Sequence, residues 1–215
     1  MPVYKCPPTR FHFIHIPRTA GRFIEAVIKD NGFQLEHNTL GYIEGVDIIH
    51  LHKELYEKYL DVKDMPHIAV IRNPIDKFFS ASPFLKRMYG DDIQEQMEDP
   101  MMFSMMLQNF PLTQAVNWFR PQSDFLTEDT HIWRFENGFN KNFSYWLSDI
   151  TGVKTIKIDR KVPYDTSPLD RENKLKRTPA LMKNIRQLYK REIDQYYPEL
   201  NNRKNIYPVV RNYYP

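Results

Sequence analysis

The chain has 215 residues, of which 41% are hydrophobic and 27% charged, so we expect one globular domain that spans residues 1–215. Its net charge of +3, from 30 Lys and Arg against 27 Asp and Glu, is too small an excess for a nucleic-acid-binding surface. The single cysteine, Cys6, can form neither an internal disulfide nor a metal cluster. No apolar run approaches the ~20 residues that cross a bilayer. We therefore expect a cytoplasmic protein with no metal, nucleic-acid or membrane partner.

A strand, a short loop and a helix are predicted over residues 11–32. The run FHFIHI is rich in strand formers and stops at Pro17, which cannot donate to a sheet, and FIEAVIKDN has helical spacing. The loop between them contains Arg18, Thr19, Gly21 and Arg22. A helix N-terminus presents unpaired N–H groups and partial positive charge, so this loop suits a phosphate or sulfate. An ordinary turn with surface arginines is an equal alternative, since the GxxxxGK[ST] phosphate-loop pattern is absent.

A second strand is predicted over residues 46–52, because apolar residues dominate VDIIHLH. It would carry His50 and His52 to its carboxyl end, before a helix over residues 53–63. Ligands of open α/β sheets bind beyond the carboxyl ends of the strands. We therefore expect both histidines at the same rim of the sheet as Arg18.

A third strand is predicted over residues 67–71, with Arg72 directly after it. Asn73 is a suitable cap and Pro74 a suitable first residue for the next helix, which should bury Phe78 and Phe79. The other faces of this helix are expected to carry Asp76, Lys77 and Ser80. The guanidinium of Arg72 and the hydroxyl of Ser80 can converge on one phosphate.

The second half of the chain predicts two more strands, at residues 130–137 and 153–159, and helices at 140–152 and 179–197. Before them, four methionines should pack a helix against the core, or alternatively form a flexible wall for an acceptor: Met101, Met102, Met105 and Met106. Residues 160–179 read as a long loop. Its basic residues Lys174, Lys176 and Arg177 could cover a bound anion, although a solvated loop is the commoner meaning.

Two of these segments, in this order, resemble the sulfotransferases that use 3'-phosphoadenosine-5'-phosphosulfate (PAPS). HIPRTAGRF is similar to the family's 5'-phosphosulfate loop, H-[IVL]-P-K-[ST]-[GA]-G-[ST]-[ST], and AVIRNPIDKFFSA to its 3'-phosphate motif, R-[ND]-P-x-[DE]-[RK]-x-x-S. Weaker similarity to bacterial-type relatives of the carbohydrate sulfotransferases continues through PQSDFL, HIWRFEN and YKREIDQYYPEL. The resemblance implies an α/β, P-loop-like fold: a mainly parallel sheet of about five strands flanked by helices.

The resemblance implies PAPS as the sulfuryl donor. The implied cofactor-binding residues are Arg18, Thr19, Ala20, Gly21, Arg22, Phe23, Arg72 and Ser80. The first motif departs from the family pattern, because Arg18 stands where a lysine usually contacts the transferring group, and Arg22 and Phe23 stand where hydroxyls usually meet the 5'-phosphate. Arg18 keeps the charge but donates a proton less readily than lysine. Arg22 either replaces the hydroxyl contacts or faces solvent.

The implied reaction is in-line transfer of a sulfuryl group to a hydroxyl, or as second choice an amine, of a carbohydrate or small metabolite. Arg18 and a histidine base would be catalytic. Relatives place this histidine before a helix like KELYEKYL, which favours His50 and leaves His52 open. His15 lies within the first apolar run and is expected to be structural rather than a ligand contact.

Two other functions stay open at this point. The departures in the first motif allow a binding module that kept the nucleotide pocket and lost the chemistry. A P-loop kinase or nucleotide hydrolase is the weaker alternative, because it would need a GK[ST] triplet that the chain lacks. The acceptor and the oligomeric state cannot be read from the pattern.

Overall fold

The computed structural model describes residues 2–36, 40–109, 117–159 and 174–202. Most of the loop predicted at 160–179 lies outside these residues. The main sheet has five strands in the order β3-β1-β2-β6-β7. They are β1 (Val3–Cys6), β2 (Thr9–Ile14), β3 (Gln34–Leu35), β6 (His67–Ile71) and β7 (His131–Arg134). β6 pairs in parallel with both β2 and β7, whereas β1 pairs antiparallel with β2 and β3. The sheet is therefore mixed, with a parallel centre, and the prediction of a mainly parallel sheet was too strong.

Two predicted strands are wrong. Residues 46–52 hold only the two-residue strand β5 (Val46–Asp47), which pairs with β4 (Tyr42–Ile43) in a separate hairpin. The 3-10 helix η1 (Ile48–His50) follows it at once. Residues 153–159 form no strand, and among the described residues β7 is the edge strand on that side of the sheet, with β3 at the other edge. In both places an apolar run packs against the core without joining a ladder of the main sheet.

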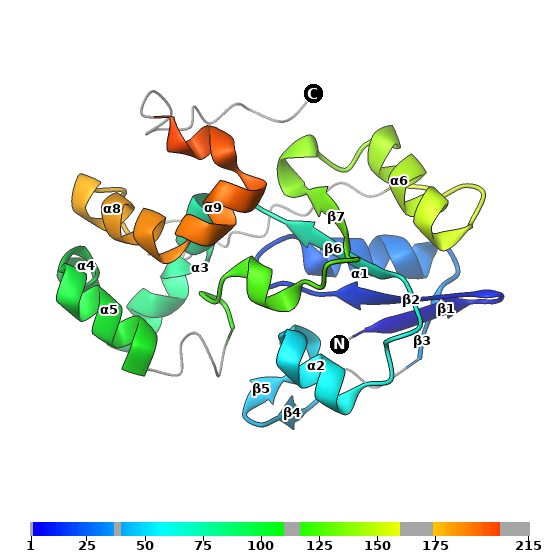
Figure 1. Ribbon diagram of the computed structural model, residues 1–215, viewed down its shortest axis with the longest axis horizontal. Helices are drawn as coiled ribbons and strands as arrows, with labels where there is room; N and C mark the ends of the chain where they lie inside the picture. The colour runs from blue at the N-terminus through cyan, green and yellow to red at the C-terminus, as the bar shows by residue number, and fades with distance from the viewer. Residues whose placement is uncertain (1, 37–39, 110–116, 160–173, 203–215) are drawn as a thin grey trace.

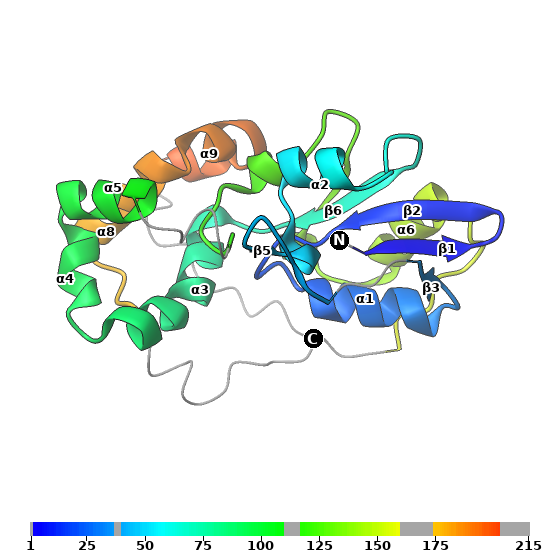
Figure 2. The ribbon, with the colours of Figure 1, turned by 90° about the horizontal axis from the view of Figure 1, so that it is seen from below.

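Helices cover both faces of the sheet (Figures 1 and 2). One face carries α1 (Gly21–Asp30) and α6 (Lys141–Thr151), which pack on Phe11 and Phe13 of β2 and on Ile68 of β6. The other face carries α2 (Lys53–Tyr59), which packs near Ile14 and Ala69. Alternate side chains of each central strand thus enter two different layers, as the two-residue period of a strand requires.

The remaining helices form a group beside the sheet, at the left of Figure 1. They are α3 (Pro74–Tyr89), α4 (Ile93–Glu98), α5 (Pro100–Asn109), α8 (Pro179–Leu188) and α9 (Lys190–Tyr196). The start of α3 is confirmed, since Asn73 Oδ1 accepts from the Ile75 N–H at 3.0 Å and Pro74 is the first helical residue. The single helix predicted over 179–197 is instead two, because Tyr189 separates α8 from α9.

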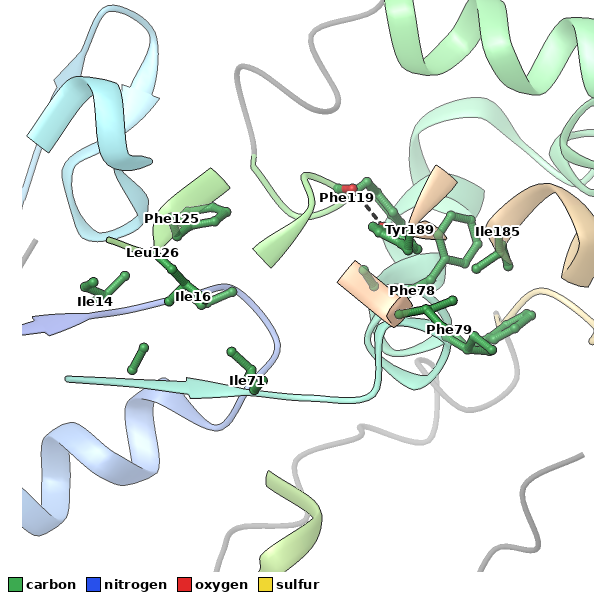
Figure 3. Packing of buried hydrophobic residues seen from close by; sticks show 14 of the residues in the cluster. Ile14, Ile16, Ile71, Phe78, Phe79, Phe119, Phe125, Leu126, Ile185 and Tyr189 are labelled. Atoms are coloured by element: carbon green, nitrogen blue, oxygen red, sulfur yellow. Dashed lines mark hydrogen bonds between the residues drawn. The ribbon is translucent and has the colours of Figure 1, made fainter. Parts of the chain in front are cut away.

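One apolar core joins this helical group to the sheet. It extends from Ile14 and Ile71 in the strands to Phe78 and Ile185 in the helices and to Tyr189 between α8 and α9 (Figure 3). Short 3-10 helices complete the described structure: η2 (Gln122–Phe125), η3 (Phe135–Asn137) and η4 (Pro198–Asn201). Across the described ranges, no helix has the length and apolar character needed to cross a membrane.

Two expectations about side chains in the helical group fail. Lys77 does not lie on an open face of α3 but is 0% exposed. Of the four methionines, Met106 is buried, whereas Met101 and Met105 of α5 are 67% and 46% exposed, so only part of the stripe packs the core. Lys77 can be buried because carbonyl oxygens surround its ammonium group: Nζ donates to the carbonyl oxygens of Trp118 and Arg120 at 2.8 and 3.0 Å.

Candidate functional site

The loop between β2 and α1 has an unusual backbone. Arg18 and Ala20 both have positive φ, at 67° and 71°, a region that non-glycine residues seldom adopt. Thr19, buried between them, donates its hydroxyl to the Ile16 carbonyl at 2.8 Å and so closes the loop. Ala20 is the N-cap residue of α1 and offers no side-chain hydrogen bond to its first turn. The N–H groups of that turn and the helix dipole therefore favour an anion at this position.

The structure brings Arg18, Arg72 and Ser80 together from two loops and a helix. Arg18 Nε donates to Ser80 Oγ at 3.1 Å, and Arg72 Nη1 donates to the Arg18 carbonyl at 3.2 Å. The loops are neighbours because β2 and β6 pair in parallel and end at the same edge of the sheet. Two guanidinium groups and a hydroxyl beside a helix N-terminus can bind phosphate or sulfate oxygens. Their roles as ligands stay a prediction.

Gly21, the first residue of α1, permits a close approach of His15. A Cβ atom at Gly21 would lie 1.9 Å from His15 Nε2, so any side chain there would overlap the imidazole ring. The ring is held from its other side, where Nδ1 donates to Glu25 Oε1 at 2.8 Å. Burial works to raise the pKa of Glu25, but the hydrogen bond and charge of His15 lower it overall. His15 is 6% exposed, as expected for a structural residue, and it shapes the loop.

His50 lies beside His15, with ring centroids 4.9 Å apart. It is the last residue of η1, and its Nδ1 lies 3.6 Å from Asp47 Oδ2. Burial lowers the pKa of His50, and hydrogen bonding to Asp47 only partly offsets this effect. The imidazole is therefore neutral at neutral pH, the state in which it can accept a proton. His50 contacts His15, and the His15 ring in turn lies against Gly21 at the end of the loop that holds Arg18.

His52 has different surroundings from His50. It precedes α2 as its N-cap, makes no capping hydrogen bond with its side chain and is 8% exposed. Burial and the charge of Arg120 lower its pKa. The expectation that a strand would carry both histidines to one rim is therefore wrong, because the strand ends at Asp47 and η1 turns the chain.

The two departures in the first motif have different positions. Arg22 is exposed, whereas Phe23 is buried and its ring centroid lies 5.0 Å from that of Phe139. Phe139 also contacts Phe135, and the guanidinium of Arg72 lies 4.7 Å from the centroid of the Phe135 ring. A row of aromatic rings thus begins at Arg72 and ends in the core.

A hollow of about 360 Å³ borders this row at Phe139. Its walls are Phe139, Asn140, Lys141, Ser144, Ile156 and Ile158. Three of these walls are apolar and three are polar, so an aromatic face and hydrogen-bonding groups are both available to a ligand there. Phe135 and Phe139 thus lie between Arg72 and the hollow.

Sequence reasoning did not assign a role to several buried polar residues behind Arg72. They are Lys77, Gln122 and Glu192, and the half-buried Glu136 lies beside them. The available signal was weak: Gln122, Glu136 and Glu192 lie in PQSDFL, HIWRFEN and YKREIDQYYPEL, segments noted only for similarity. Of the predicted loop over 160–179, Arg177 forms an ion pair with Asp76 at 2.5 Å.

No group of three or more His, Cys, Asp or Glu residues in the described parts of the chain could hold a metal ion. Comparison of the chain with family models, with curated proteins and with solved structures gives no match.

Proposed function

We propose that the protein is a PAPS-dependent sulfotransferase, one domain with a P-loop-like site, that sulfates a hydroxyl of a carbohydrate or small metabolite. An amine is the second choice of acceptor, and we propose a cytoplasmic setting. The observation that carries the proposal is the convergence of Arg18, Arg72 and Ser80 at the edge where β2 and β6 end. Arg18 and the first turn of α1 would bind the 5'-phosphosulfate, and Arg72 with Ser80 the 3'-phosphate.

The aromatic row supports the same ligand. A nucleoside bisphosphate carries a flat base beside its phosphates, and the hollow next to Phe139 lies along the row that starts at Arg72. Aromatic faces bind bases by stacking, with little dependence on hydrogen bonds. We therefore place the adenine toward Phe139 in this proposal.

In the proposed reaction the acceptor oxygen attacks the sulfur as the bond from sulfur to the bridging oxygen breaks. The acceptor proton passes to Nε2 of His50, because Nδ1 faces Asp47. The electron pair of the broken bond stays on the leaving 5'-phosphate, whose charge Arg18 and the N–H groups of α1 stabilise. Adenosine 3',5'-bisphosphate (PAP) and the sulfated acceptor are the products. His50 is preferred to His52 as the base because it contacts His15 beside the loop.

Calorimetric binding of PAP tests the cofactor site. We expect Arg72→Ala to weaken PAP binding about 10- to 100-fold, since it removes a charge-assisted contact with the 3'-phosphate. Binding of 5'-AMP, which lacks that phosphate, should change less. Arg10→Ala is the matched control, because Arg10 pairs with Glu36 near the opposite end of β2. Equal PAP affinity in Arg72→Ala and wild type would contradict the proposal.

Turnover with labelled PAPS and a panel of sugars and small hydroxyl compounds tests the chemistry. We expect His50→Ala to lower turnover about 10²- to 10⁴-fold with unchanged PAP binding, whereas His52→Ala keeps most of the rate. The reverse result would assign the base to His52. PAP binding without transfer to any acceptor would favour the binding module, and magnesium-dependent ATP turnover the kinase-like alternative.

A further inference from the structure

The main chain at the end of β6 is held by side chains from two distant segments. The Arg72 N–H donates to Gln122 Oε1 at 2.8 Å, and Gln122 Nε2 donates to the Arg72 carbonyl at 2.7 Å. The next N–H, that of Asn73, donates to Glu136 Oε1 at 2.6 Å. Three consecutive main-chain groups therefore depend on two side chains for their hydrogen bonds.

Both of these side chains are held in turn from α9 and the residue that follows it. Glu192 Oε2 accepts from the Gln122 main-chain N–H at 2.7 Å, and Glu192 Oε1 accepts from Gln122 Nε2. Tyr197, directly after α9, donates its hydroxyl to Glu136 Oε2 at 3.0 Å. Gln122 is 0% exposed, Glu192 1% and Tyr197 1%, whereas Glu136 is half-buried, so water does not substitute for the contacts between Gln122 and Glu192.

The carboxylate of Glu192 fixes which way the Gln122 amide points. Gln122 Nε2 donates hydrogen bonds to two acceptors, the Arg72 carbonyl and the Glu192 carboxylate. Gln122 Oε1 accepts a hydrogen bond from the Arg72 N–H. Rotating the amide by half a turn would place donor against donor at the Arg72 N–H and acceptor against acceptor at Glu192. In a buried site each such mismatch leaves a polar group unsatisfied. Glu192 of α9 thus reinforces the amide orientation that the Arg72 main chain requires.

The charge of Glu192 is balanced inside the protein. Lys77 of α3 is buried in the same part of the core. Its ammonium group donates hydrogen bonds to the carbonyls of Trp118 and Arg120, which shortly precede Gln122 in the sequence. Burial raises the pKa of Glu192, and the positive charge of Lys77 opposes this rise. Opposite charges that are buried near each other are often no more stabilising than apolar residues of similar volume. Stabilisation of the fold therefore gives little reason for burying Glu192 and Lys77. Orientation of the residues at the end of β6 does give a reason.

We propose that Glu192 and Tyr197, which we call the α9 brace, are positioning residues that hold Arg72 in place through Gln122 and Glu136. The inference rests on the proposed function in assigning Arg72 to the 3'-phosphate. The brace itself touches no substrate. Its effect is to keep the Arg72 guanidinium aimed at the Arg18 carbonyl, next to the Arg18–Ser80 hydrogen bond.

The test uses Glu192→Gln and Tyr197→Phe in the full chain. Glu192→Gln keeps the side-chain volume but places an NH2 group opposite an N–H donor of Gln122. Tyr197→Phe removes only the hydroxyl that donates a hydrogen bond to Glu136. Asn184→Ala is the matched control: Asn184 is buried in α8 and donates to the carbonyls of Met97 and Glu98, which lie outside the contacts around Arg72. All three variants are expected to lose stability.

Two measurements separate positioning from general stability. We expect residue-resolved hydrogen exchange at the Arg72 amide to rise at least about tenfold relative to Ala69 in both brace variants, and no such change of ratio in Asn184→Ala. We also expect PAP affinity to fall about tenfold in Glu192→Gln and less in Tyr197→Phe, with 5'-AMP affinity nearly constant.

The outcomes distinguish the two proposals. An unchanged exchange ratio at Arg72 in both brace variants would overturn the brace, whatever the ligand. Increased exchange with unchanged PAP affinity would also overturn it, because Arg72 would then not need positioning. A wild-type protein that binds neither PAP nor PAPS would overturn the proposed function alone, since the exchange measurement needs no ligand. Where Glu192→Gln does not fold, Tyr197→Phe supplies the same readouts.

Discussion

Gly21 shows how one missing side chain shapes the loop. Its own backbone does not demand glycine by a positive φ, but the His15 ring occupies the space that a Cβ would take. We expect Gly21→Ala to lower the free energy of unfolding by about 1–3 kcal/mol, the usual cost of overpacking, as measured by urea denaturation. The clash would displace the His15 ring or the start of α1, and with it the loop.

A double-mutant cycle identifies the cause of this loss. In a His15→Ala background the ring is absent, so Gly21→Ala should have little effect or even stabilise the first turn of α1. A loss that is equally large in both backgrounds would show that the clash with His15 is not responsible.

At the scale of an element, α3 contains a proline at position 83, and a neighbouring hydroxyl compensates for it. Pro83 has no N–H to offer the carbonyl of Phe79 four residues earlier. Ser82 Oγ donates to that carbonyl at 3.0 Å and accepts from the Leu175 N–H at 3.1 Å. This buried hydroxyl thus replaces the hydrogen bond that Pro83 cannot donate, and it also binds the segment that leads into α8.

Ser82→Ala is expected to lower the free energy of unfolding by about 1–3 kcal/mol, because it leaves buried polar groups without partners. Adding Pro83→Ala restores an N–H that can reach the Phe79 carbonyl, so the double variant should recover part of the loss. Thermal or urea unfolding of the two single variants and the double variant measures this coupling. If the changes in the free energy of unfolding of the two single variants simply add in the double variant, Ser82 does not compensate for Pro83.

At the scale of the whole molecule, buried histidines should make stability depend on pH. His12 is fully buried and its Nδ1 lies 2.9 Å from Nδ1 of His67, its partner across the β2–β6 pair. Burial lowers the pKa of His12 and of His67, as it does for His50 and His52. Their contribution to stability is fully present above the unfolded pKa of about 6.5, and it is lost as the pH falls from there toward the lower folded pKa.

We therefore expect the free energy of unfolding to fall between pH 7.5 and 5.5, by up to about 1.4 kcal/mol per pH unit for each histidine. The raised pKa values of Glu136 and Glu192 act in the opposite direction over this range, so the comparison needs a variant. His12→Asn keeps a polar atom near Nδ1 of His67 but does not titrate. Its stability should fall less steeply with acid, and an equal slope would contradict the role of the pair.

Local signals explain which parts of the fold were predictable. The start of α3 depends on Asn73 and Pro74, and the loop after β2 on Pro17 and Gly21, all adjacent in the sequence to the elements they delimit. Strand pairing is not local, so the apolar run at 46–52 could not be told from a 3-10 turn, and 153–159 lacks a ladder partner among the described residues. β1 was missed because only its pairing with β2 makes Val3–Cys6 a strand.

The same distinction applies to the candidate site. Arg18, Arg72 and Ser80 follow predictable strand ends and helix starts, so their proximity could be expected from topology. Gln122 and Glu192 act on backbone atoms far away in the sequence, and no spacing rule connects them to Arg72. Lys77 was misplaced because its carbonyl partners come from residues 118–120, which give it a buried environment that the helix pattern does not show.

The contacts around Arg72 link segments that are remote in the chain: 62 residues separate Arg18 from Ser80, 50 separate Arg72 from Gln122, and 70 separate Gln122 from Glu192. Each contact closes a long loop, and long loops are slow to close during folding. A partly folded chain can hold its local helices and still lack this arrangement. Recovery of nucleotide binding after denaturation should therefore lag behind recovery of helical signal, and a refolding time course would follow assembly of the strand ends.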